Sequence, residues 1–139
     1  MDFNWNDMIA DEDRGFLVSL NLSALSFLIF PIIGIIVPLI IWNLKKGKVK
    51  GLNDLAKKML NFQITCCSVL FIVYIIAIRR AFASIGTFLS NTDTTIMLAL
   101  SLCILAIYAY NLIFIIINSI RLSNGKSAVY FPAIPFLRK

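Results

Sequence analysis

Long runs of apolar residues without any charge alternate along this chain with short polar and charged stretches. A helix needs about 20 such residues to cross the roughly 30 Å hydrocarbon core of a bilayer. Three runs approach or exceed that length. The pattern predicts an all-α integral membrane protein, one membrane domain over 1–139, with three transmembrane helices at 16–44, 62–79 and 95–120.

The first run is too long for one straight span. No charge occurs between Arg14 and Lys45, and a straight helix of that length would measure about 45 Å. Pro31 and Pro38 each remove a backbone hydrogen bond and bend a helix. We expect a single Pro-kinked, tilted helix. The alternative is a hairpin of two short helices that turns near residues 30–34 and moves the N-terminus to the other side of the membrane.

Residues 52–62 carry apolar side chains on one face of a helix. Leu52, Leu55, Met59 and Phe62 recur at i, i+3, i+7 and i+10, with polar and charged residues between them. A basic amphipathic helix suits the surface of an anionic leaflet. We therefore expect an amphipathic cytoplasmic helix that leads into the second span. The alternative is that these residues are the first turns of that span.

The basic residues are distributed unevenly about the spans. With three spans, ten of the 13 lysines and arginines fall on the side of the 45–50 loop. Basic residues favour the cytoplasmic side, so this loop and the C-terminus are predicted to be cytoplasmic and the N-terminus external. The charge of +6 flanks apolar spans, which indicates contact with anionic lipid heads and not with nucleic acid. The lysines expected to make this contact are Lys45, Lys46, Lys48, Lys50, Lys57 and Lys58.

Two sets of polar or small residues recur at helical spacing inside the spans. Such faces pack helices together, because amides and hydroxyls in lipid need hydrogen-bond partners. We expect them to contact other helices or a partner protein; the alternative for the second set is a substrate or ion pathway. The first set is Ser19, Ser23 and Ser26, and the second is Ser101, Tyr108, Asn111 and Asn118.

The C-terminal residues 122–139 have the composition of neither a helix nor a free tail. Pro132 and Pro135 forbid a regular helix, while the stretch between Val129 and Phe136 is strongly apolar. We expect a membrane-associated tail that lies beside the amphipathic helix.

Catalytic and metal-binding side chains are scarce. The chain has no histidine, the commonest general base and metal ligand. Cys66, Cys67 and Cys103 lie inside apolar runs, where a free cysteine packs as a small hydrophobe. We expect no enzyme activity, no catalytic residue, no metal and no cofactor.

Four short motifs suggest a family. They lie at Pro38–Lys46, Leu60–Gln63, Asn124–Lys126 and Tyr130–Pro132. With them the chain resembles, over residues 16–137, the small bacterial Tic-twenty-like membrane domain family of unknown function. That family is distantly similar to the protein-import subunit of the chloroplast inner envelope. The resemblance implies an α-helical membrane fold in the bacterial cytoplasmic (inner) membrane.

The function expected from these features is a non-enzymatic accessory subunit of a larger membrane complex. Its partners would be anionic lipids and another membrane protein or further copies of the chain. The alternative is a protein-translocation or transport component that lines a pathway as an oligomer, for which the resemblance offers only a distant analogy.

Overall fold

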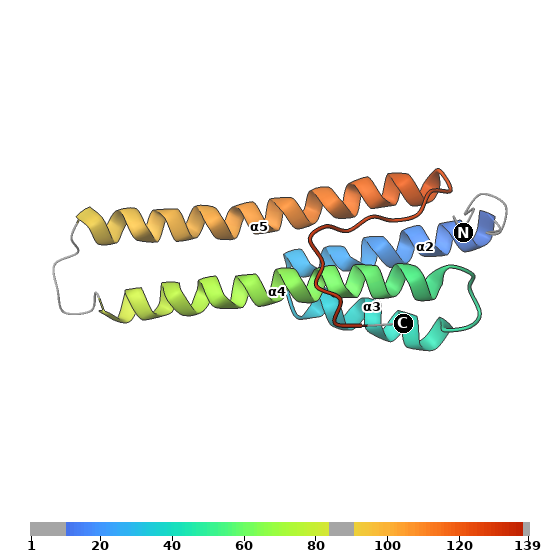
Figure 1. The fold of residues 1–139 in the computed structure, drawn as a ribbon, viewed down its shortest axis with the longest axis horizontal. Coiled ribbons are helices and arrows are strands. Elements are labelled where there is room, and N and C mark those ends of the chain that lie inside the picture. The colour runs from blue at the N-terminus through green and yellow to red at the C-terminus, as the bar shows by residue number, and fades with distance from the viewer. Residues whose placement is uncertain (1–10, 84–90, 138–139) are drawn as a thin grey trace.

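The computed structural model describes residues 11–83 and 91–137 (Figure 1). These residues form one 3-10 helix, four α-helices and no strand. The all-α prediction is therefore confirmed for the described part of the chain. In chain order the elements are α2 (Asp11–Ser23), η1 (Ala24–Leu28), α3 (Ile33–Lys45), α4 (Leu52–Ala83) and α5 (Asn91–Ser123).

Two helices, α4 and α5, are long and apolar enough to cross a membrane. In α4, twenty uncharged residues separate Lys58 from Arg79, a length of about 30 Å. In the most apolar stretch of α5 only 11 % of the residues are buried, whereas a core helix of a soluble protein would be mostly covered. The apolar side chains of α5 therefore face outward, as they do in a helix surrounded by lipid.

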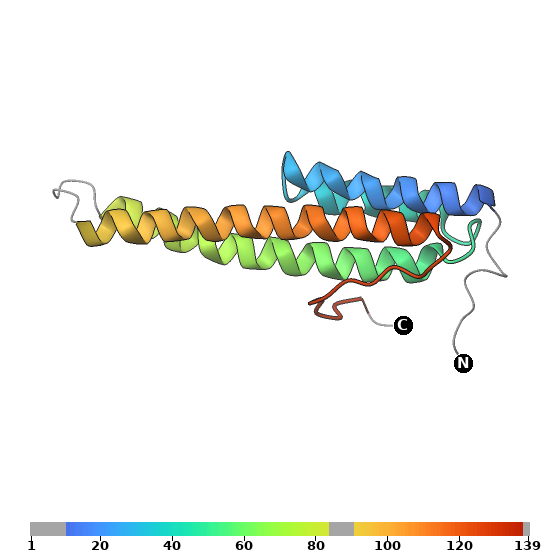
Figure 2. The ribbon, with the colours of Figure 1, turned by 90° about the horizontal axis from the view of Figure 1, so that it is seen from above.

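Residues 16–44 do not form the single kinked span expected from their sequence. The helical path reverses after η1, and α3 runs back beside α2 (Figures 1 and 2). Gly34 permits this reversal, because a Cβ atom there would lie 2.5 Å from the Cβ of Phe27. The first arm consists of α2 and η1, with 13 and five residues, and its uncharged part begins only at Gly15. The second arm, α3, has 13 residues, about 20 Å, and is too short to span the membrane. The expected kinked span was wrong, and the hairpin alternative is the observed arrangement.

The hairpin changes the side of the molecule on which the first helix begins. The start of α2, the 46–51 loop and the end of α5 all lie at one end of the molecule, which we call the lysine end (Figure 1). Arg79 and Arg80 lie near the other end of α4. The start of α2 therefore lies on the same side as the lysines, and not opposite them as the three-span arrangement required.

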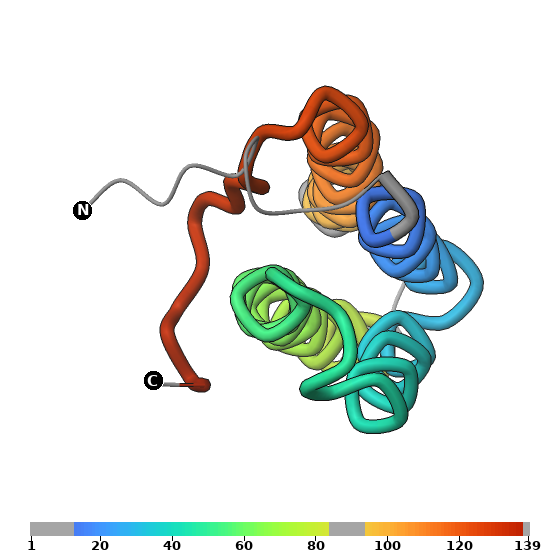
Figure 3. The backbone as a smooth tube through the Cα atoms, turned by 90° about the vertical axis from the view of Figure 1, so that its right-hand side faces the viewer, coloured from blue at the N-terminus to red at the C-terminus, as the bar shows by residue number. Residues whose placement is uncertain are grey.

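The core lies in the half of the molecule toward the lysine end. There α2, η1 and α3 cover one side of the α4–α5 pair, and the tail (residues 124–137) covers another (Figure 3). The stripe predicted at 52–62 is buried in this core, and α4 runs from it into the apolar stretch without a break. Phe62 lies at its centre, with ring centroids 5.2–6.1 Å from those of three other rings, Tyr110, Phe114 and Tyr130.

Candidate functional site

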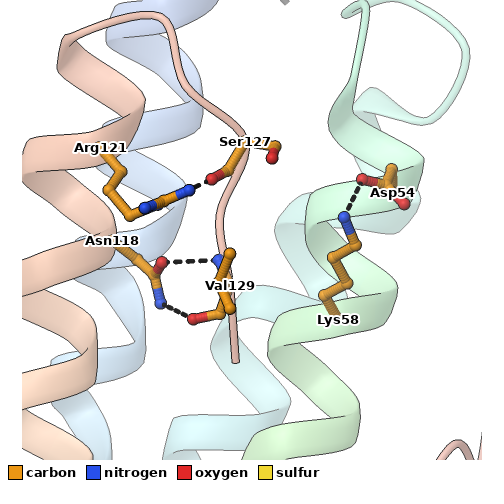
Figure 4. Close-up of polar contacts among 6 residues, drawn as sticks. All are labelled: Asp54, Lys58, Asn118, Arg121, Ser127 and Val129. Carbon is orange, nitrogen blue, oxygen red and sulfur yellow. Dashed lines mark hydrogen bonds and ion pairs between the residues drawn. The ribbon is translucent and has the colours of Figure 1, made fainter. Parts of the chain in front are cut away.

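Asn118 of α5 binds the main chain of the tail at two points. Its Nδ2 donates to the carbonyl oxygen of Val129, and its Oδ1 accepts from the amide of the same residue, both at 2.8 Å (Figure 4). One turn away, Arg121 Nε donates to the carbonyl oxygen of Ser127 at 3.0 Å. The turn that leads into the tail is closed by Gly125 at φ 70°, where glycine carries no steric penalty.

Together with Asn118 and Arg121, side chains of α4 also bind the main chain of the tail, and we call this set of hydrogen bonds the clamp on the tail. Asn61 Oδ1 accepts from the amide of Leu137 at 2.8 Å, and Thr65 Oγ1 accepts from the amide of Ile134 at 3.0 Å. The Tyr110 hydroxyl of α5 donates to the carbonyl oxygen of Phe131. All these bonds reach the tail's main chain. Ala128 and Tyr130 of the tail are buried, whereas four of its other apolar side chains are at least half exposed: Val129, Phe131, Ile134 and Phe136.

Asn21 connects three parts of the fold. Its Nδ2 donates to the carbonyl oxygen of Ile115 and to Ser119 Oγ, each at 2.8 Å. Its Oδ1 accepts from the hydroxyl of Tyr130 in the tail. Asn21 is fully buried, and burial raises the pKa of the Tyr130 phenol well above its usual range. The hairpin, α5 and the tail are thus joined by one buried polar group.

A buried amide pair links α4 and α5 deeper in the bundle. Asn111 Nδ2 donates to Gln63 Oε1 at 3.0 Å, and both side chains are fully buried. Among the described residues, Gln63 Nε2 and Asn111 Oδ1 have no further hydrogen-bond partner. The pair sets the register of the two long helices.

An apolar cavity of about 330 Å³ lies next to this pair, between α4, α5 and the tail. Its walls include Phe62, Cys66, Val69, Ile107 and Pro132. Among residues 11–83 and 91–137, no group of three or more metal-ligating side chains occurs. The cavity is suited to an apolar group and offers no charged side chain to a polar one.

The four residues of the polar face predicted on the third span have different surroundings in the structure. Asn111 and Asn118 are buried against α4 and the tail, as described above. Tyr108 packs on Phe27 of η1, with ring centroids 5.6 Å apart. Ser101 is exposed, and its hydroxyl donates to the carbonyl oxygen of Met97 in its own helix.

The three serines of the hairpin also bond to their own backbone. Ser19, Ser23 and Ser26 donate to carbonyl oxygens three or four residues earlier, at 2.6–2.9 Å. The side of α2 and η1 that enters the core carries other residues, namely Leu17, Leu20, Asn21, Ala24 and Phe27.

The predicted lysines lie at the lysine end. Lys45 is exposed at the end of α3, and Lys46, Lys48 and Lys50 are exposed on the 46–51 loop, where Gly47 and Gly51 adopt positive φ. Two further lysines, Lys57 and Lys58, are partly exposed on α4, and Lys58 pairs with Asp54 at 2.7 Å (Figure 4). Such an exposed pair adds little stability, about 0–1 kcal/mol.

Loop and helices are fastened at Trp42. Its Nε1 donates to Asn53 Oδ1 at 2.7 Å, and Lys46 Nζ lies 5.5 Å from its ring centroid. These contacts hold the end of α3 beside the start of α4.

Several residues that hold the structure together were not predicted from the sequence. Asn111 and Asn118 were predicted as contacts because an amide in lipid needs a hydrogen-bond partner. The same reasoning applies to any amide in an uncharged run. That signal is present at two of the missed positions, Asn21 and Gln63. It is weaker for the other three, Asn61, Thr65 and Tyr130, whose partners lie in the tail.

Comparison with known proteins corrects the expected family. No curated protein and no solved structure shows a significant match to the chain. A family model, that of the magnetosome magnetite crystal formation protein family, matches residues 12–137. The Tic-twenty-like resemblance was wrong, because it rested on short, mostly apolar motifs that many helical membrane proteins can share. The match covers nearly the whole sequence, and the chain belongs to the magnetosome magnetite crystal formation (MamF/MmsF) family.

Proposed function

We propose that this chain is a non-catalytic membrane subunit that serves magnetite crystal formation as part of a larger membrane complex. The family supplies the process, and the exposed surface of α5 supports the subunit role. Ala99, Cys103 and Ala106 follow one another at i, i+4 and i+7 on this helix, and all three are exposed. Small residues at this spacing allow another spanning helix to approach closely.

The use of the buried polar groups supports a role without catalysis. Asn21, Asn61, Thr65 and Asn118 each bond to main-chain groups of another segment of the chain. Their hydrogen-bonding capacity is spent on holding the hairpin, the helices and the tail together. The exposed helical surface is therefore the part of the molecule available for association.

We propose that the lysine end faces the cytoplasm. Of the described lysines and arginines, nine lie toward the lysine end, and only Arg79 and Arg80 lie at the opposite end of α4. The positive-inside rule then places the 46–51 loop, the start of α2 and the tail on the cytoplasmic side of the membrane.

The test is purification of the tagged full-length chain from a magnetite-forming host in mild detergent, followed by mass spectrometry of the co-eluting chains. A stoichiometric membrane-protein partner supports the subunit role. A homogeneous oligomer of this chain alone contradicts it and favours the alternative, an oligomer that lines a pathway.

A matched pair of variants tests the contact surface. Cys103→Leu adds bulk to the small-residue face and should reduce recovery of the partner several-fold, while membrane insertion stays unchanged. Leu105→Ile changes an exposed residue on another side of the same helix and should leave recovery as in the wild type. Equal recovery with both variants would exclude this face as the contact.

A further inference from the structure

The depth of the hairpin can be derived from contacts between helices. The uncharged stretch of α4 begins at Met59, and Gln63 lies about 6 Å further along it. Asn111 meets Gln63 there, and Tyr108 lies about 5 Å deeper on α5. Because Phe27 packs on Tyr108, the turn that follows it lies near the middle of a 30 Å core.

The turn itself is suited to that depth. Three of its side chains, Ile29, Phe30 and Ile32, are 63–75 % exposed although they are strongly apolar. Most amides of the turn are also paired: those of residues 29 and 30 bond to the carbonyl oxygen of Ser26, and those of residues 33–36 bond to the carbonyl oxygens of residues 30 and 32. Pro31 has no amide hydrogen. Irregular backbone can enter hydrocarbon only when its polar groups are paired in this way.

The two halves of the molecule therefore differ in width. The half toward the lysine end contains α2, η1, α3 and parts of both long helices, with the tail alongside (Figures 1 and 2). The other half, as far as the structure describes it, contains only α4 and α5 (Figure 1). Each helix is about 10 Å wide, so the protein occupies roughly twice the area in one leaflet that it occupies in the other.

From this asymmetry we infer that the chain is a wedge that prefers, and stabilises, curved membranes. The hairpin of residues 11–45 enters only the leaflet at the lysine end and displaces its acyl chains, while the opposite leaflet accommodates two helices. A bilayer relieves this mismatch by bending so that the lysine end lies on the convex side. The partner of the hairpin surface is the acyl-chain layer of that one leaflet.

This activity goes beyond the proposed subunit role and is tested without any partner protein. The purified full-length chain with Lys48→Cys is reconstituted into small and large vesicles of the same phosphatidylethanolamine and phosphatidylglycerol mixture. A membrane-impermeant maleimide reports the fraction of lysine loops that face outward. The native cysteines lie in apolar helices, and the unsubstituted protein measures their background.

The ratio of outward to inward loops should rise several-fold from large to small vesicles, because only the outer leaflet of a small vesicle is strongly convex. A ratio that does not depend on vesicle size overturns the inference. So does a size dependence that persists when the hairpin no longer enters the membrane.

The double variant Phe30→Asp/Ile32→Asp provides that second condition, since two carboxylates at the turn oppose its entry into hydrocarbon. It should lose the size dependence. Leu44→Asp is the matched control, because it adds a carboxylate to an exposed position of α3 at the lysine end. The control should behave as the wild type does. If the curvature preference holds while no partner co-purifies, only the subunit role fails; the reverse result removes only the wedge.

Discussion

Asn118 illustrates how single side chains organise this protein. Its side-chain amide donates one hydrogen bond to Val129 of the tail and accepts another from it. The two bonds pair the main chain of Val129 as a neighbouring β-strand would. Buried main-chain groups that lose such a partner cost about 1–3 kcal/mol. Polar side chains of the helices therefore help to fix the position of the tail, together with the buried Tyr130 of the tail itself.

Replacing Asn118 with leucine should consequently lower the free energy of unfolding by about 1–3 kcal/mol, because the amide and carbonyl of Val129 lose their partner. Thermal unfolding in detergent, followed by circular dichroism, measures the loss. Limited proteolysis should also cut the tail faster. Asn43→Leu, at an exposed position of α3, is the control and should change neither result.

Tyr130 gives the protein a sensitivity to alkaline pH. Burial raises the pKa of its phenol in the folded state above the usual value of 10.0. The folded state then holds its proton more tightly than the unfolded state does, so this contribution to stability is complete below pH 10.0 and declines as the pH rises toward the folded pKa. The wild type should therefore lose stability above that pH more steeply than Tyr130→Phe.

The same substitution tests the bond to Asn21. At neutral pH Tyr130→Phe should be less stable by about 1–3 kcal/mol, since Asn21 Oδ1 loses the tyrosine hydroxyl as donor. Unfolding temperatures measured across the pH range separate the two effects. Parallel pH profiles for the two proteins would contradict the prediction, because they would mean that the Tyr130 phenol has the same pKa in the folded and the unfolded state.

At the scale of elements, the hairpin depends on the close contact between η1 and α3. Gly34→Ala would place a methyl group 2.5–2.8 Å from three atoms of Phe27, two of which belong to the backbone. Because backbone cannot yield as a flexible side chain does, the variant should be destabilised by at least about 2 kcal/mol. Chemical or thermal unfolding in detergent measures this.

Gly15→Ala is the matched control for that change. A Cβ atom at Gly15 meets nothing within 4 Å, and alanine favours a helix over glycine by about 1 kcal/mol. This variant should be as stable as the wild type or slightly more stable. Equal losses in the two variants would mean that the contact at Gly34 does not hold the hairpin.

The elements also show what sequence can and cannot predict. Long uncharged runs led directly to α4 and α5, because length and composition alone decide whether a helix suits a bilayer. The hairpin was not favoured, because the decisive contact joins Gly34 to Phe27 and a proline predicts a kink as readily as a turn. The burial of Leu52, Leu55 and Met59 depends on the same hairpin, which covers a stripe that otherwise resembles a membrane-surface helix.

Among the residues predicted as helix contacts, the type of side chain determines whether the residue bonds to another segment or to its own helix. Amides in a span have no adequate partner in their own helix, so Asn111 and Asn118 bond to other segments. Serine hydroxyls can reach the preceding turn, and Ser19 and Ser101 do so. Helical spacing alone could not separate these two behaviours.

The molecule as a whole is predicted to place the 46–51 loop and the far end of α4 on opposite sides of the membrane. In intact cells a cysteine at Lys48 should resist an impermeant thiol reagent, whereas one at exposed Ala83, at the far end of α4, should react. After cell disruption both should react. The reverse pattern would place the lysine end outside and contradict the proposed orientation.

The clamp on the tail has a consequence for biosynthesis. The tail follows every helix in the chain, so the ribosome makes it after α4 and α5 have been synthesised. Until it emerges, Asn61, Thr65 and Asn118 lack the main-chain groups that they bind in the finished protein. In the newly inserted helices these side chains therefore lack their partners for a time. They become paired only when the tail has been synthesised and has bound to the helices.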